Sequence, residues 1–472
     1  MTQTEGADFT KGNMMGHVTV MSLTSSIGIM AIYVVDLLDI FFISLLGQQQ
    51  IAAAAGFATT IMFFIGAVSI GVSVASGTLT AHYLGRKQRQ LADDATSAST
   101  IIGMAVGIVM PLFMFPFLPQ LVGFLGATGE VQDLAVMYLQ IVLPASCLSS
   151  MSMCLVASMR AHGYAKWAMY PAIAGALVNL IFDPLLIFGL NMDLSGAATA
   201  TVMARLATFA IAYYACFKLF RIAARPDLAM IRRHAREITY YALPSVLSSI
   251  AAPIGLALIT RQFTKYGIGA VAAIAIIGRL NPVIFAVINA LAGAIGPIIA
   301  QNHGAGLHDR ARRGYYDATR FLVIYVSCAI ALMFVFRSSI ADAFSATGLT
   351  RDLLYFYCGP FAMIAFFNGQ LFVSSAAFNA MGKPQYAPLL NWAKNTVGIV
   401  VIAMPASYFF GVYGLATGIL VNAALFAVTS HILTLRVMNA AEERKDLVVE
   451  VDEDSFDATK HVVTAYREPL HT

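Results

Sequence analysis

The sequence predicts an all-α membrane protein with twelve transmembrane helices, arranged as two pseudo-symmetric lobes of six helices each. The first observation is composition, because 59% of the 472 residues are hydrophobic and only 11% are charged, whereas a soluble domain has about 25% charged residues. The second is a series of long apolar runs, each able to cross a hydrocarbon core of about 30 Å as a helix. The third is an internal repeat, in which the second half of the chain resembles the first.

The apolar runs define the expected spans. Helices are expected and not barrel strands, because the runs are too long and too continuously apolar for strands that alternate in polarity. Residues 1–17 are polar and lead directly into the first run, so an uncleaved first span is expected and not a signal peptide. In chain order the twelve expected spans are 18–46, 52–82, 98–121, 133–160, 167–190, 195–218, 237–264, 269–300, 317–340, 351–381, 388–409 and 411–437.

The repeat appears as short motifs that recur at one offset. The motif ATG at 127–129 recurs at 346–348, and GTLTAHYLG from Gly77 is matched by GPIIAQNHG from Gly296. Because each half has an even number of spans, both halves enter the membrane in the same sense. We therefore expect a pseudo-two-fold axis along the membrane normal, with a substrate path between the lobes that opens to each side in turn.

Loop charge predicts the orientation of the spans. Most loop lysine and arginine residues lie on the side of the N-terminus, which the positive-inside rule places in the cytoplasm. Both termini are then cytoplasmic, and we expect a multi-pass protein of the cell (inner) membrane. The loop cations on this side are Arg86, Lys87, Arg89, Arg160, Lys166, Lys218, Arg221, Arg225, Arg232, Arg233, Arg236, Arg310, Arg312, Arg313, Arg320 and Lys383.

The longest and most basic connector divides the chain into two halves. The expected parts are a cytoplasmic N-terminal segment, the N-terminal lobe, the basic cytoplasmic connector, the C-terminal lobe and a cytoplasmic tail, at 1–17, 18–217, 218–236, 237–437 and 438–472. The tail is charged and lacks a sustained apolar face, which is typical of a flexible extension.

Two carboxylates lie inside membrane-length apolar runs, Asp39 in AIYVVDLLDIFFISLLG and Asp183 in VNLIFDPLLIFGL. An ionised carboxylate at the bilayer centre costs at least about 2.5 kcal/mol, so such residues usually face a cavity and mark an ion or proton pathway. Asn179 lies one helical turn from Asp183 on the same face, and Thr201 reaches a similar depth in the sixth span.

These four residues form the expected cation-coupling site. Oxygen ligands suit a hard cation such as sodium, and a buried carboxylate suits a proton. The alternative is that the four polar groups only hold helices together by hydrogen bonds. Asp36 shares the approximate face of Asp39, where it either extends the cavity or pairs with a neighbour.

Three further residues are candidates for a cavity or substrate site. Arg205 lies one turn from Thr201, where it could pair with a carboxylate or face a water-filled interface. A fixed cation there would repel sodium, which favours protons slightly. In the second half neither buried carboxylate has an acidic repeat partner, and the best candidates there are Arg279 in the eighth span and Asn368 in the tenth.

Composition and motifs exclude several other classes of function. The net charge of +4 comes from the basic loops, so no nucleic-acid partner is expected. No HExxH, GxSxG or paired catalytic aspartate motif lies at a suitable depth, so no enzyme is expected. The five cysteines lack disulfide or metal spacing, so no cofactor and no metal beyond a possible sodium ion is expected. The expected partners are the lipid bilayer and small amphipathic or cationic substrates, and we expect a monomer.

Several motifs carry a resemblance to a known family. They are VNLIFDPLLIFG from Val178 with GAATATVMAR from Gly196, GPIIAQNHGAGLHDRAR from Gly296, and the short AHGYAK and AMGKPQ that fall in inner loops. Over about residues 18–437 the chain resembles the MATE (multidrug and toxic compound extrusion) family. The resemblance implies two six-helix lobes in a V shape, and export of drugs or organic cations in exchange for protons or sodium.

Within that family the chain looks more like the DinF branch than the NorM branch. The DinF pattern has an acid in span one, an Asn-x-x-x-Asp pair in span five and a threonine in span six, which here are Asp39, Asn179, Asp183 and Thr201. The NorM branch uses a glutamate in span seven and an aspartate in span ten. Span seven here has no acid, and Asn368 stands at the span-ten position. The resemblance therefore implies that coupling takes place in the first lobe.

The leading hypothesis is a secondary active efflux antiporter that works by alternating access. It would exchange protons or sodium for drugs or other amphipathic, often cationic compounds. Two alternatives within the same superfamily are a flippase for a lipid-linked precursor and a dedicated metabolite exporter. A passive channel fits less well, because a two-fold repeat with buried carboxylates suits alternating access better than a pore.

Overall fold

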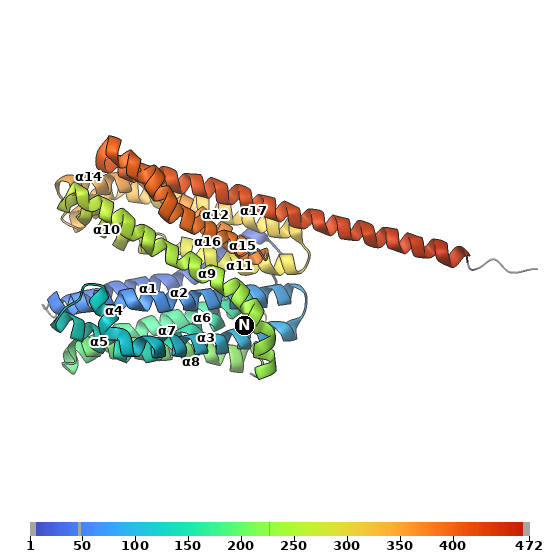
Figure 1. The fold of residues 1–472 in the computed structure, drawn as a ribbon, viewed down its shortest axis with the longest axis horizontal. Coiled ribbons are helices and arrows are strands. Elements are labelled where there is room, and N and C mark those ends of the chain that lie inside the picture. Colours follow the sequence, from blue (N-terminus) through green and yellow to red (C-terminus); the bar gives the residue numbers. More distant parts are fainter. Residues whose placement is uncertain (1–5, 46–48, 226, 466–472) are drawn as a thin grey trace, which may run out of the picture.

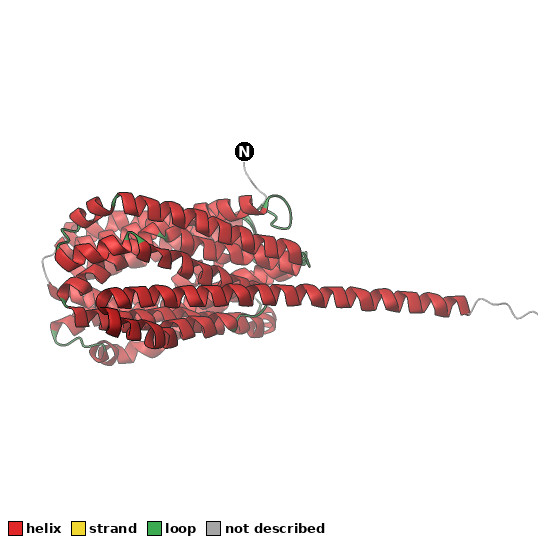
Figure 2. Cartoon of the chain, turned by 90° about the horizontal axis from the view of Figure 1, so that it is seen from above, coloured by secondary structure: helices red, strands yellow, loops and turns green. Residues whose placement is uncertain are grey.

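The chain folds into two helical lobes, which lie one above the other in Figure 1. The structure is a computed structural model that describes residues 6–45, 49–225 and 227–465. Within these residues every regular element is a helix and no strand occurs (Figure 2). The predicted all-α class is confirmed.

The first lobe holds its six spans in eight α-helices among the described residues, because prolines break two of the spans. Pro116 follows α3 and Pro144 follows α5, and proline removes a backbone donor and clashes with the preceding turn. The helices are α1 (Met14–Leu45), α2 (Gln49–Gly85), α3 (Arg89–Met114), α4 (Leu118–Phe124), α5 (Glu130–Val142), α6 (Ser146–Ala161), α7 (Ala165–Pro184) and α8 (Asp193–Tyr213).

Of two breaks in the second lobe, one corresponds to a break in the first lobe and one does not, since the first-lobe counterpart of the bend lies inside the unbroken α2. Pro360 separates α14 from α15, and a bend of 48° separates α10 from α11. The helices are α9 (Leu228–Phe263), α10 (Ile268–Ile284), α11 (Ala286–Gly304), α12 (His308–Val335), α13 (Arg337–Ala343), α14 (Gly348–Tyr357), α15 (Ile364–Ala380), α16 (Tyr386–Trp392) and α17 (Met404–Ala465).

The described helices account for the expected number of spans. By length and composition ten helical segments can cross a membrane, or eleven if the bent pair α10 and α11 is one span. The segment Tyr386–Glu443 has 58 residues, which at 1.5 Å per residue is far longer than a hydrocarbon core of about 30 Å. Gly411, with φ 61° and ψ −145°, interrupts it. Its two arms therefore correspond to the expected spans 388–409 and 411–437.

The connector and the tail contain more helix than expected. Helix α9 begins at Leu228, inside the connector 218–236. Helix α17 continues to Ala465, where a flexible tail was expected at 438–472 (Figure 2). No glycine or proline between Gly418 and Pro469 stops the helix. The end of the tail from residue 466 and residues 1–5 of the N-terminal segment lie outside the described residues.

The two lobes meet along α1 and α2 of the first lobe and α9 and α11 of the second. The closest approach joins two copies of the repeat, because a side chain on Gly85 would collide with the Gln301 carbonyl oxygen. A side chain on Gly304, the repeat partner of Gly85, would collide with the His82 carbonyl oxygen. Small residues allow backbones to approach in this way. The crossing therefore lies on the pseudo-two-fold axis that the repeat predicts.

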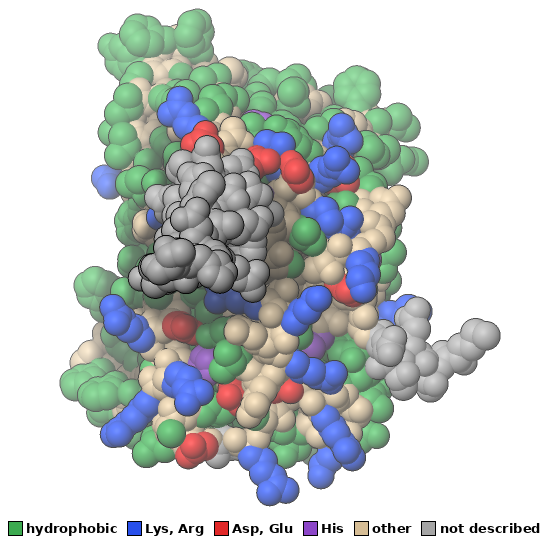
Figure 3. Space-filling model, turned by 90° about the vertical axis from the view of Figure 1, so that its right-hand side faces the viewer, with side chains coloured by type: hydrophobic (Ala, Val, Ile, Leu, Met, Phe, Trp, Pro, Cys, Tyr) green, Lys and Arg blue, Asp and Glu red, His purple; other side chains and the backbone are tan. Residues whose placement is uncertain are grey.

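This crossing lies at the end of the molecule that carries most loop cations, which we call the basic end. Figure 3 shows lysine and arginine side chains scattered over this end. The N-terminal segment lies here too, with a fully buried Phe9. The Phe9 backbone N–H donates to Gln301 Oε1 at 3.1 Å, and its carbonyl accepts from Asn302 and Arg310, each at 3.0 Å. The segment therefore covers the end of the second lobe before α1 enters the first.

Candidate functional site

The first lobe encloses a cavity of about 460 Å³ between α1, α6, α7 and α8. On α1 its walls run from Ser25 to Asp36, and on α7 they run from Ala168 to Asn179. Each stretch corresponds to about 16 Å along a helix axis at 1.5 Å per residue. The cavity is therefore elongated along the helices and occupies the middle part of the lobe.

A cluster of carboxylates lies at the end of the cavity away from the basic end. The side chains of Asp39 and Asp183 hydrogen-bond to each other, and Asn179 Nδ2 donates to Asp39 Oδ2 at 3.4 Å. Two carboxyl groups can bond in this way only if one of them carries a proton to donate. The predicted grouping of Asp39, Asn179 and Asp183 is present in the structure.

The cluster retains unused acceptor oxygens. Asp39 Oδ1, Asn179 Oδ1 and Asp183 Oδ2 are buried and have no hydrogen-bond partner among the described residues, and Asp183 as a whole is 1% exposed. Unsatisfied buried acceptors are costly and call for a proton, a cation or water. The arrangement can therefore accept a proton, coordinate a cation or bind water.

Thr201 is connected to the cluster through a residue that the sequence analysis did not select. Tyr138 on α5 hydrogen-bonds to Thr201, while Thr201 Oγ1 donates to the Ala197 carbonyl at 3.0 Å. The charges of both buried carboxylates act on the Tyr138 hydroxyl, so this hydroxyl lies close to the cluster. The signal that could have identified it is a tyrosine at matching depth in the fourth span.

Arg205 faces the break between α5 and α6. Its Nη1 donates to the Val142 carbonyl at 3.0 Å and to Ser146 Oγ at 3.3 Å. The last carbonyls of a helix have no donor within the helix. Arg205 supplies a donor to one of them, the Val142 carbonyl, at the break that contains Pro144. Arg205 forms no ion pair with the residues that the structure describes. The carboxylate cluster thus has no fixed cation bound to it.

Three charged residues line the cavity, namely Arg205, Asp36 and Arg160. Asp36 is exposed on the cavity wall, where its charge acts on Asp39, so it extends the cavity, one of the two roles considered for it. Arg160 lines the same cavity at the basic end. Sequence reasoning placed Arg160 among the loop cations, because it is the penultimate residue of its helix.

The candidates of the second lobe do not join this site. Arg279 on α10 is exposed. Asn368 on α15 accepts a hydrogen bond from Lys394 Nζ at 2.5 Å, within the second lobe. Neither residue lines the cavity of the first lobe. The chemistry assembled in the described part of the chain is therefore asymmetric, with the carboxylate cluster in one lobe only.

Comparisons with known proteins agree with this architecture. The family model MatE matches residues 25–185 and 244–409, one segment in each lobe. A FAD transporter of Shewanella oneidensis is 26% identical over 434 residues, covering 88% of this chain and 93% of the relative. The multidrug export protein MepA of Staphylococcus aureus (strain bovine RF122) is 24% identical over 421 residues, covering 87% of this chain and 91% of the relative.

Solved structures share the fold. A MOP superfamily transporter from Pyrococcus furiosus superposes with a TM-score of 0.87 at 20% identity, covering 94% of this chain and 100% of the other. A multidrug resistance MATE family transporter in an outward-facing conformation gives the same TM-score, identity and coverage. At this identity the likeness concerns the fold alone, which is two six-helix lobes in a V shape.

Proposed function

The chain belongs to the MatE family of membrane transporters, and from this premise we propose that it is a proton-coupled antiporter that exports amphipathic organic compounds. The observation that carries the proposal is the Asp39–Asp183 carboxyl pair beside the cavity of the first lobe. A pair of carboxyl groups that share one proton can bind a second and release it again. Sodium is the alternative ion, since three unpartnered oxygens could contribute to its coordination.

Exchange would follow from coupling between the cavity and the carboxyl pair beside it. Substrate occupies the cavity while the pair holds one proton, and uptake of a further proton from outside changes the charge and hydrogen bonding at that end. Asn179 belongs both to the cavity wall and to the carboxylate cluster, because it lines the cavity and donates a hydrogen bond to Asp39. Through Asn179 the change at the carboxylates reaches the substrate side and favours release.

The direction of transport rests on the orientation of the basic end. By the positive-inside rule we place this end, together with both termini, in the cytoplasm. The glycine crossing at Gly85 and Gly304 then closes the cytoplasmic side. In this proposal the described conformation is the outward-facing state, from which substrate leaves and protons enter.

A gradient experiment tests the coupling. Purified protein in proteoliposomes is assayed for ethidium and norfloxacin movement, with a pH gradient and a sodium gradient imposed separately. We expect transport under the pH gradient, and its loss in Asp183→Asn, because the amide cannot take up or release the coupling proton. Asp133→Asn, which neutralises an exposed carboxylate of α5, is the matched control and should transport as the wild type does. Transport driven by sodium alone, or retained in Asp183→Asn, contradicts proton coupling at this pair.

A dedicated metabolite exporter is the second candidate. The relative named as a FAD transporter favours it, because that name describes a bulky anionic compound and not an organic cation. Absence of ethidium and norfloxacin transport in folded protein would point to this function. A flippase for a lipid-linked precursor is less favoured, because the carboxylate cluster would repel a pyrophosphate.

A further inference from the structure

Arg160, the penultimate residue of α6, is a cation without a counter-charge among the described residues. Its guanidinium lines the cavity inside the first lobe, yet no described residue forms an ion pair or a hydrogen bond with it. Charged groups within membrane-spanning segments are costly, and they persist where they pair or serve a pathway. An unpaired guanidinium facing a cavity therefore calls for an anion that is not part of the protein.

Two arginines line the cavity, and they differ in their partners: Arg205 donates hydrogen bonds to α5 and α6, whereas Arg160 has no described partner. Arg160 lies at the basic end, whereas Asp36 and Asn179 lie about 16 Å further along their helices at 1.5 Å per residue. Between the ends the walls are largely apolar, with Ile29, Val156 and Met169 among them. The volume of about 460 Å³ suits a small organic molecule.

We propose that Arg160 is a substrate-binding residue that holds the carboxylate of an amphipathic anion or zwitterion, with the apolar body of that substrate extending toward Asn179. This inference rests on the proposed transport function and specifies its substrate class. Guanidinium groups bind carboxylates through paired, charge-assisted hydrogen bonds. A purely cationic compound would leave Arg160 unpaired and would be repelled by it.

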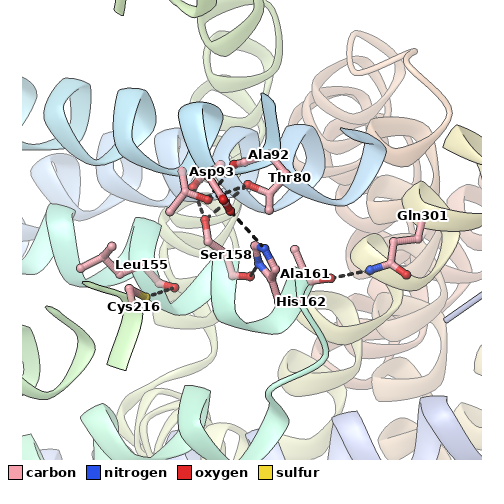
Figure 4. A network of polar contacts seen from close by, with 11 residues as sticks. Thr80, Ala92, Asp93, Leu155, Ser158, Ala161, His162, Cys216 and Gln301 are labelled. Atoms are coloured by element: carbon pink, nitrogen blue, oxygen red, sulfur yellow. Dashed lines mark hydrogen bonds and ion pairs between the residues drawn. The ribbon is translucent and has the colours of Figure 1, made fainter. Parts of the chain in front are cut away.

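Hydrogen bonds hold the helix on both sides of Arg160, and Figure 4 shows two of them, from Ser158 to Thr80 and from Gln301 to Ala161. Ser158 Oγ hydrogen-bonds to Ser76 at 3.0 Å and to Thr80 at 3.4 Å, both on α2. The Ala161 carbonyl accepts from Gln301 Nε2 at 2.6 Å, across the boundary between the lobes. A binding residue held in this way loses little conformational freedom when its ligand arrives.

The guanidinium also touches the other lobe. A side chain on Gly293 of α11 would collide with Arg160 Nη1, so Arg160 reaches the boundary between the lobes. When the lobes separate at the basic end, this group becomes accessible from that side. The carboxylate of a cytosolic substrate would then be the first part to be captured.

A matched pair of ligands tests the proposal. Norfloxacin carries a carboxylate, and norfloxacin methyl ester has the same ring system without it. Binding of each is measured at equilibrium, by calorimetry, to full-length protein in phosphatidylcholine nanodiscs. We expect the wild type to bind norfloxacin about tenfold more tightly than the ester, because a hydrogen-bonded pair of charges contributes about this factor to the affinity. Arg160→Gln should remove this preference, and Arg160→Lys should retain part of it.

The control and the contradicting outcomes are defined in the same assay. Lys166→Gln, which removes an exposed cation two residues before the cavity-lining Ala168 on α7, should keep the full preference. A wild type that does not prefer the carboxylate, by binding both ligands equally or neither, overturns the proposal. So does a preference that survives in folded Arg160→Gln protein. Phosphatidylglycerol in the nanodiscs should leave norfloxacin affinity unchanged; a clear loss would assign Arg160 to a lipid phosphate instead.

Because binding is measured without a gradient, the result is independent of coupling. Failure of ion-driven transport would leave a carboxylate preference intact. Conversely, transport of ethidium with no carboxylate preference would support the proposed antiporter function and contradict the role of Arg160 as an anion-binding residue.

Discussion

At the scale of single residues, the charged side chains inside the first lobe differ in the hydrogen-bond partners that the structure gives them. The Asp39–Asp183 pair satisfies part of its own hydrogen bonding and leaves acceptors for a further ion. Arg205 satisfies a backbone carbonyl at a helix break. Arg160 has no described partner, which is why it carries the substrate inference.

Tyr138 is expected to adjust the coupling site without being essential to it. Tyr138→Phe removes the hydrogen bond to Thr201 while keeping the ring, and a single hydrogen bond contributes about 0.5–1.5 kcal/mol. Export under a pH gradient should therefore fall by roughly tenfold at most, far less than in Asp183→Asn. Tyr213→Phe on the exposed face of α8 is the control. Complete loss of export in Tyr138→Phe would show that the hydroxyl itself takes part in proton transfer.

Sequence reasoning found the carboxylate cluster but not its surroundings. Asn179 and Asp183 share a helix face by their spacing, and depth alone brings Asp39 to the same level. The partner of Arg205 could not be predicted, because it is a backbone carbonyl exposed by a proline break in another helix. Arg160 was overlooked because a cation at a helix end normally faces the cytoplasm, and only the fold shows that it lines a cavity.

At the scale of helices, breaks in the spans determine what the side chains can reach. Pro144 ends α5 and leaves its last carbonyls without helical donors, and Arg205 on α8 supplies one donor from across the lobe. The lobe thus uses a charged side chain where an unbroken helix would use its own backbone. Sequence reasoning selected Arg205 but did not connect it with the break at Pro144.

The Arg205 bridge should stabilise the first lobe. Arg205→Gln removes the donors to the Val142 carbonyl and Ser146 Oγ, and an unsatisfied buried acceptor costs about 1–3 kcal/mol. The midpoint of thermal unfolding in detergent should fall by several degrees. Arg279→Gln, which alters an exposed arginine, should leave the midpoint nearly unchanged. Equal midpoints for Arg205→Gln and the wild type would mean that the bridge contributes no stability.

At the scale of the whole molecule, the internal repeat is visible as a contact between its own copies. Gly85 and Gly304 stand at equivalent positions, and each lies against the backbone of the other copy. The motifs that revealed the repeat are therefore the surfaces on which the lobes close. Sequence comparison of the halves predicted the two lobes and their axis, whereas the place of closest contact required coordinates.

A larger side chain at this crossing should open the basic end. Gly85→Leu cannot fit against the Gln301 carbonyl, so the population should shift toward the state that is open at the basic end. Spin labels at the exposed positions Arg89 and Arg313, in a cysteine-free background, should move apart in a pulsed electron resonance measurement. Gly56→Leu, on the same helix with open space around it, is the control. Identical distance distributions in Gly85→Leu and the wild type would contradict this role of the crossing.

The N-terminal segment has a consequence for the balance between the two conformational states. Its residues continue into the first lobe, yet Phe9 is anchored to Gln301, Asn302 and Arg310 of the second. These hydrogen bonds therefore join the two lobes, and they must break when the lobes separate at this end. Contacts that form in only one of two conformational states shift the equilibrium toward that state by their free energy. The N-terminal segment would then help to set the populations of the two conformational states, although it lines neither the cavity nor the carboxylate cluster. Shortening this segment would change those populations and leave both sites unaltered.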